Sequence, residues 1–97
     1  MRPVRERTES NELIRTEVDR SRGIGYRELL LLRKPQHRTV EGASGVTYAI
    51  TSQAFWDDPR HPGDLHVTVS LWEERRSGRS DAAGDFIVRP DGTFVGE

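Results

Sequence analysis

Residues 46–55, VTYAITSQAF, and residues 65–73, LHVTVSLWE, decide the fold, because apolar and polar side chains alternate along both stretches. Successive side chains of a β-strand point to opposite faces of a sheet, so the alternation predicts two strands with one apolar and one polar face. Antiparallel sheets commonly have one face packed on the core and one face in solvent. We therefore predict an antiparallel sheet whose apolar face is covered by another layer.

The alternation also predicts a register when the two strands are laid antiparallel with their apolar faces together. The expected pairs are Tyr48 with Leu71, Ile50 with Val69 and Ser52 with Val67 on the apolar face, and Thr51 with Thr68 and Gln53 with His66 on the polar face. A shift of one strand by one residue would bury its polar side chains, so the alternation excludes such a shift.

The size and composition of the chain limit what can cover this sheet. The protein has 97 residues, of which 33% are hydrophobic and 32% are charged. A chain of this length forms one domain, and its small supply of apolar side chains supports one sheet covered by one helix. We expect residues 1–8 to be a flexible tail and residues 9–97 to be a single small domain.

A helix is predicted over residues 9–22, before the two strands. Leu13, Ile14 and Val18 recur at helical spacing, and Thr8 or Ser10 can cap the N-terminus. The glycine at position 23 supplies a stop signal. The Gly23-Ile24-Gly25 segment is interpreted as a hinge, because a dinucleotide fingerprint would need a strand before it and a helix after it.

The remaining elements are shorter. Residues 26–33 favour a helix by propensity but a strand by length and flanking breakers, and we predict a strand covered on both faces. A short strand is expected at 38–41 and a longer one at 85–89, with Ser77, Gly78 and Gly84 forming turns in the connection before it. Pro90-Asp91-Gly92 predicts a tight turn that returns residues 93–95 as an arm. The architecture is therefore α+β, an N-terminal helix packed on one face of a mainly antiparallel sheet of about four strands.

The segments FWDDPRHPGDLHVTVSL and DFIVRPDGTFVGE carry a resemblance to known sequences. They are similar to short uncharacterised bacterial proteins that share an aromatic-Asp-Asp loop and a closing Pro-Asp-Gly-x-Phe-Val-Gly-Glu. The resemblance covers about half of the chain. It implies a fold and no activity.

Several classes of protein are excluded or disfavoured by composition. The chain has no cysteine, which excludes disulfides, thiolate nucleophiles and Cys-based metal sites. Its longest apolar run, Leu29 to Leu32, is too short to cross a bilayer, and MRPVRERTES lacks the apolar stretch of a secretory signal. We expect a cytoplasmic protein that uses no cofactor and binds no membrane.

The densest group of metal-ligating side chains is Asp57, Asp58, His61, Asp64 and His66. Mixed His and carboxylate sets can bind divalent ions, but this spacing matches no metal signature, and Asp and Pro are ordinary turn residues. Metal-dependent activity at the Asp57–His66 loop is therefore the third hypothesis. Neighbouring acids such as Asp57 and Asp58 do not define a catalytic site, and we expect the protein not to be an enzyme.

The first hypothesis is a non-catalytic protein-binding or self-associating module. Phe55 and Trp72 fall on the polar face of the predicted sheet, beside a stripe of small residues, and Trp56 lies at the strand end. Aromatic residues concentrate at the centres of protein interfaces. We predict a contact surface that contains Phe55, Trp56, His66 and Trp72, and the partner is another protein or a second copy of the chain.

The alternative hypothesis is a nucleic-acid-binding module that uses the Arg-rich N-terminal half. Residues 1–49 contain ten basic and seven acidic side chains, and the candidate contacts are Arg15, Arg22, Arg27, Arg33, Lys34 and Arg38. Basic residues neutralise phosphates and exposed aromatic side chains stack on bases. The interleaved acids and a pI near 6.3 disfavour this alternative.

Overall fold

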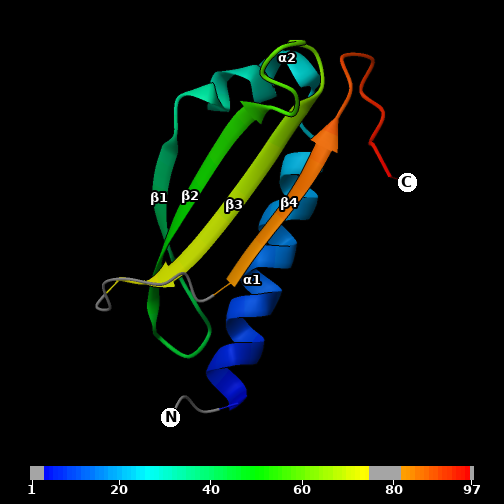
Figure 1. Cartoon of the computed structure of the whole chain (residues 1–97). Coiled ribbons are helices and arrows are strands. Elements are labelled where there is room, and N and C mark those ends of the chain that lie inside the picture. The colour runs from blue at the N-terminus through cyan, green and yellow to red at the C-terminus, as the bar shows by residue number, and fades with distance from the viewer. Residues whose placement is uncertain (1–3, 75–81, 97) are drawn as a thin grey trace.

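The computed structural model describes residues 4–74 and 82–96 and shows an N-terminal helix packed against a four-stranded antiparallel sheet (Figure 1). The elements are α1 (Val4–Arg22), α2 (Tyr26–Leu29), the 3-10 helix η1 (Leu30–Arg33), β1 (Gln36–Glu41), β2 (Thr47–Trp56), β3 (Leu65–Glu73) and β4 (Ala82–Val88). Each strand pairs with the next along the chain, in the order β1-β2-β3-β4. The predicted α+β architecture is confirmed.

Helix α1 begins at Val4, earlier than predicted, and ends at Arg22 as predicted. Thr8 and Ser10 therefore lie inside the helix and do not cap it, and residues 4–8 of the predicted tail are helical. Contacts beyond the helix hold its N-terminal half in place, because the Glu9 carboxylate accepts hydrogen bonds from the Ser44 amide, in the loop after β1, at 3.0 Å and from the Tyr48 hydroxyl of β2 at 3.0 Å. Packing of this kind stabilises helices more than propensity does.

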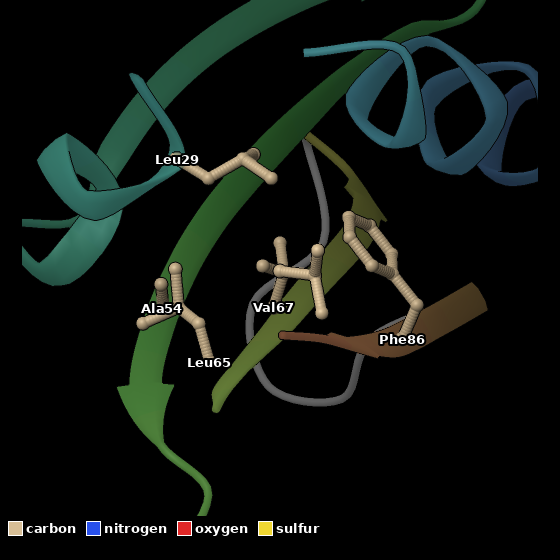
Figure 2. Packing of buried hydrophobic residues seen from close by; sticks show 6 residues of the cluster. Leu29, Ala54, Leu65, Val67 and Phe86 are labelled. Carbon is tan, nitrogen blue, oxygen red and sulfur yellow. The ribbon is translucent and has the colours of Figure 1, made fainter. Parts of the chain in front are cut away.

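The core lies between the sheet and the helices. Ile14 of α1 packs against a cluster of Tyr48, Ile50, Val69 and Leu71, as the predicted apolar stripe requires. A second cluster contains Leu29, Ala54, Leu65, Val67 and Phe86, in which Leu29 approaches the sheet from α2 (Figure 2). Helix α1 contacts mainly β4 and β3, and η1 contacts β2. Two separate helical segments therefore cover the apolar face.

The strand prediction for residues 26–33 is wrong, because this segment forms α2 and η1. The amides of Glu28 and Leu29 both donate to the Gly25 carbonyl at 3.0 Å, which starts the helical turn. Leu29 is 1% exposed whereas Leu31 is 67% exposed. A strand of four consecutive leucines would need apolar cover on both faces, and a one-layer helix cover cannot supply it.

The two alternating strands form where they are predicted, but their register differs by two residues. Ile50 pairs with Leu71 and Ser52 pairs with Val69. A two-residue shift keeps every side chain on its predicted face, so the apolar pattern does not distinguish the two registers. The loop decides between them, because the Asp57 amide donates to the Asp64 carbonyl at 2.9 Å and continues the pairing beyond Trp56 and Leu65.

Edge strand β4 covers Ala82–Val88 instead of the predicted residues 85–89, and it buries Phe86 and Val88. Gly84 lies within this strand and does not form a turn, whereas Ser77 and Gly78 lie outside the described residues. The turn before the arm is confirmed, since Gly92 has a φ of +89°. Val95 of the arm donates its amide to the Ile87 carbonyl at 2.9 Å. At the opposite edge of the sheet, β1 covers residues 36–41, so it begins two residues before the predicted strand at 38–41.

Candidate protein-binding face

Among residues 4–74 and 82–96, no helix packs on one face of the sheet, and we call it the open face (Figure 1). The register aligns alternate side chains of all four strands on this side. They are His37, Thr39 and Glu41 of β1, Thr47, Ala49, Thr51, Gln53 and Phe55 of β2, His66, Thr68, Ser70 and Trp72 of β3, and Ala83, Asp85 and Ile87 of β4. Tyr48, Ile50 and Ala54, at the alternate positions of β2, are buried under the helices.

Aromatic side chains lie at the two ends of the open face and small ones lie between them. Trp72 is opposite Ala49 at one end, and Phe55 is opposite His66 at the other. Ala49 and Phe55 are six positions apart on one strand, which corresponds to about 20 Å. Phe55 is 48% exposed, and Trp72 is half-buried. The structure thus places three of the predicted contact residues on one face without bringing the two aromatic residues together.

Trp56, the fourth predicted contact residue, lies on the other side of the sheet. It packs against the cluster that contains Leu29 and Ala54, and the guanidinium of Arg33 lies 4.6 Å from the centre of its ring. The period-two geometry of β2 explains this, since Phe55 and Trp56 are neighbours and point to opposite faces. Trp56 is therefore part of the helix-covered side and not of the open face.

The open face is depleted of charge although the chain as a whole is rich in it. Its described strand positions include no lysine or arginine, and the acids there are Glu41 and Asp85. Asp85 accepts a hydrogen bond of 2.7 Å from His66 Nε2. His37 Nδ1 and Thr51 Oγ1 share a hydrogen bond of 2.8 Å. Polar groups that already bond to each other cost less to remove from water when a second surface covers them.

The loop between β2 and β3 contains the group of side chains for which metal binding was the third hypothesis. Within the loop, His61 Nδ1 lies 2.9 Å from Asp58 Oδ2, and Asp58 Oδ1 accepts the Arg60 amide at 3.0 Å. The hydrogen bond with His61, together with that from Arg60, holds the pKa of Asp58 below its usual value. His66 is bonded to Asp85 on the open face and not to this loop. Among the described residues, no three His, Asp or Glu side chains are grouped so that they could hold a metal ion.

The basic residues of the nucleic-acid hypothesis lie on α1, α2, η1 and β1 and, for Lys34, between η1 and β1. Of these residues, Arg33 lines a pocket together with Phe55 of the open face. Arg22 stacks over the ring of Phe94 at 4.4 Å, Arg33 stacks over Trp56, and Arg38 forms an ion pair with Glu17. Arg15, Arg27 and Lys34 are exposed. A base-stacking surface needs aromatic and basic side chains side by side. The open face does not provide that combination at its described strand positions.

Sequence reasoning missed a cavity of about 580 Å³ on the helix-covered side. It lies between the last turn of α1, the α2 and η1 segment, and β1, and its lining includes Arg20, Leu31 and Arg38. The sequence signals for it are weak. They are the spacing of Glu17 and Arg20 on one helix face and an apolar run, Leu29 to Leu32, that was interpreted as a strand.

No protein-family model, curated protein or solved structure matches this chain. The resemblance to short bacterial proteins therefore stays a prediction. In the part of the chain that the structure describes, no helix has the length and apolar content that crossing a bilayer requires.

Proposed function

We propose that this protein is a non-catalytic module that self-associates, and that two copies pack through their open faces. The observation that carries the proposal is the composition of that face. It combines aromatic ends, a centre of small uncharged side chains and no lysine or arginine at its described strand positions, in a chain of which 32% is charged. Depletion of charge and enrichment in aromatic residues distinguish interface centres from other protein surfaces.

The small side chains at the centre permit close packing of two sheets. Sheets that stack face to face lie about 10 Å apart, with side chains of both filling the space between them. Thr51 and Ser70 are paired at the centre of the face, and Ala83 lies beside Ser70 on β4. A second sheet can approach these residues closely, whereas bulky central side chains would hold it away.

Charge favours a second copy as the occupant. In a two-fold interface the same patch contacts itself, so an unpaired charge near its centre would meet its own copy. Asp85 lies on edge strand β4, and it is bonded to His66. Glu41 lies at the end of edge strand β1. The face therefore tolerates its own copy without repulsion at the centre.

The test is the mass of the protein in solution, measured by sedimentation equilibrium over a range of concentrations. We expect a dimer for the wild-type chain. Ser70→Arg places a charge at the centre of the open face and should yield a monomer with an unchanged melting temperature. Asn11→Arg, at an exposed position of α1, adds the same charge elsewhere and should leave the dimer intact.

Trp72→Ala separates an interface role from a role in the fold. We expect weaker dimerisation with little change in melting temperature, because the side chain lies on the open face opposite a small residue, Ala49. A wild-type chain that remains monomeric at every concentration would refute self-association. An unchanged dimer mass combined with a large drop in melting temperature would show that Trp72 stabilises the monomer instead.

A further inference from the structure

The cavity on the helix-covered side has one apolar wall. It is formed by Ile24, in the turn before α2, and by Leu29, Leu31 and Leu32 of α2 and η1. Leu29 is buried and belongs to the core, but Leu31 is 67% exposed and is one of two large hydrophobic side chains with such exposure in the described chain. An exposed leucine on the wall of a concave site offers apolar contact to a bound molecule.

The opposite wall is cationic and is held in place by a buried carboxylate. Glu17 is 3% exposed. Its Oε1 accepts a hydrogen bond of 2.6 Å from Arg20, and its Oε2 accepts one from Arg38 of β1. Both arginines line the cavity and are about half exposed. One carboxylate thus fixes two guanidinium groups beside each other.

The two guanidinium groups retain the capacity to bind an anion. Each guanidinium carries five N–H donors in a planar fork, and the bonds to Glu17 occupy two donors of Arg20 and one of Arg38. Glu17 also neutralises only one of the two positive charges. Arginine forks bind carboxylates with two parallel hydrogen bonds when the geometry allows it.

The charge of the whole cavity selects a single negative charge over a double one. Glu28, on α2, also lines the cavity and contributes a second carboxylate to its surroundings. With Glu28 counted, the two arginines and the two glutamates sum to zero, so no positive charge is left in excess. A dianion such as phosphate would be opposed by both carboxylates twice as strongly as a monoanion, which can still accept the free N–H donors of Arg20 and Arg38.

From these contacts we infer that the cavity binds a small amphipathic monocarboxylate, with its alkyl chain on Leu31, Leu32 and Ile24 and its carboxylate on Arg20 and Arg38. A volume of about 580 Å³ is within the range of small-molecule sites. The cavity lies on the helix-covered side of the sheet, although His37 of edge strand β1, which the register places on the open face, also lines it.

Calorimetric titration of the wild-type chain with octanoate, 1-octanol and inorganic phosphate tests the inference. We expect saturable binding of octanoate and a rise in melting temperature, weaker binding of 1-octanol, and no binding of phosphate. Arg20→Gln leaves Glu17 paired with Arg38, and it should weaken octanoate binding about tenfold, because one charge-assisted contact contributes about 1.5 kcal/mol. Its effect on 1-octanol should be small.

A matched pair of substitutions separates this site from the open face. Leu31→Asp puts a carboxylate on the apolar wall and should abolish octanoate binding without changing the dimer mass. Phe55→Asp makes the same change at the other exposed hydrophobic residue, and it should weaken dimerisation without changing octanoate binding. Equal binding of octanoate and 1-octanol, binding of phosphate as tight as that of octanoate, or full octanoate binding by Leu31→Asp would each overturn the inference. Failure of dimerisation alone would leave it standing.

Discussion

Gly84→Ala is the substitution that tests the packing of α1 on the sheet most directly. Gly84 is within β4, paired with Val69, and its missing side chain faces Val18 of the helix. A Cβ atom at position 84 would lie 2.7 Å from Val18 Cγ2. Since unstrained carbon contacts are about 3.5 to 4.0 Å, the two groups would overlap by about 1 Å. Glycine here permits the close approach of helix and strand.

The expected cost follows from two opposing effects. Overpacking of this kind costs about 1 to 3 kcal/mol, because Val18 is β-branched and has little rotamer freedom in a helix. Replacing a strand glycine by alanine recovers about 0.5 to 1 kcal/mol of backbone entropy. We therefore expect Gly84→Ala to lower the free energy of unfolding by about 1 to 2 kcal/mol. In a domain of this size that corresponds to roughly 4 to 16 °C in melting temperature.

The assay is urea unfolding followed by circular dichroism, in a double-mutant cycle with Val18→Ala. Without the Val18 methyl groups the overlap disappears, so Gly84→Ala should become neutral or slightly stabilising in that background. Gly25→Ala is the matched control, because a Cβ at Gly25 meets nothing within 4 Å; its effect should stay within about 0.5 kcal/mol. Equal destabilisation by Gly84→Ala with and without Val18→Ala would refute the proposed close approach.

Three further substitutions test the ion-pair cluster and the assignment of sheet faces. Burial alone would raise the pKa of Glu17, but the hydrogen bond from Arg20 and the charges of Arg38 and Arg20 outweigh it, so the pKa lies below its ordinary 4.5. A lowered folded pKa means that the stabilisation is present above pH 4.5 and is lost as the pH falls through the folded value. Glu17→Gln should therefore lower the free energy of unfolding by about 2 kcal/mol at neutral pH and by less in acid, as measured by urea unfolding at both pH values; equal losses would contradict the cluster. Leu71→Ala should cost about 2 to 5 kcal/mol in the same assay, because Leu71 is fully buried, whereas Ser70→Ala on the open face should cost less than about 0.5 kcal/mol. Similar costs at both positions would contradict the face assignment.

The alternating strands were predictable because side-chain period fixes which face each residue occupies. Val67, Val69 and Leu71 are fully buried, and Thr68 and Ser70 lie on the open face, as predicted. The period cannot fix the register, since a shift by two residues preserves both faces. The hydrogen bond between the Asp57 amide and the Asp64 carbonyl, in the loop after Trp56, favours the observed pairing. The alternation of apolar residues carries no information about this bond.

Local signals failed where tertiary contacts decide the structure. Glycine is a common turn residue, but Gly84 lies within a strand, where its missing side chain leaves room for Val18 of α1. Only the packing of the helix on the sheet shows this role. The run from Leu29 to Leu32 has strand-like flanks, yet it forms helical turns of which Leu29 alone is fully buried. The cavity could not be predicted for the same reason, because one of its walls is the segment that was assigned as a strand.

The cavity exists because one helix is too narrow to cover a four-stranded sheet. A helix with its side chains is about 10 to 12 Å across, whereas four strands spaced by about 4.8 Å need wider cover. Helix α1 packs over β3 and β4, and η1 covers part of β2. On the inner side of β1, Val40 packs against the cluster that contains Ile14, but the strand extends past this apolar cover at position 38. At this position β1 carries a charged residue, Arg38, which reaches back to Glu17 of α1. The ion pair thus ties the uncovered edge strand to the helix and also forms the cationic wall of the cavity. The same substitution, Glu17→Gln, should therefore loosen β1, whereas substitutions on the open face should not.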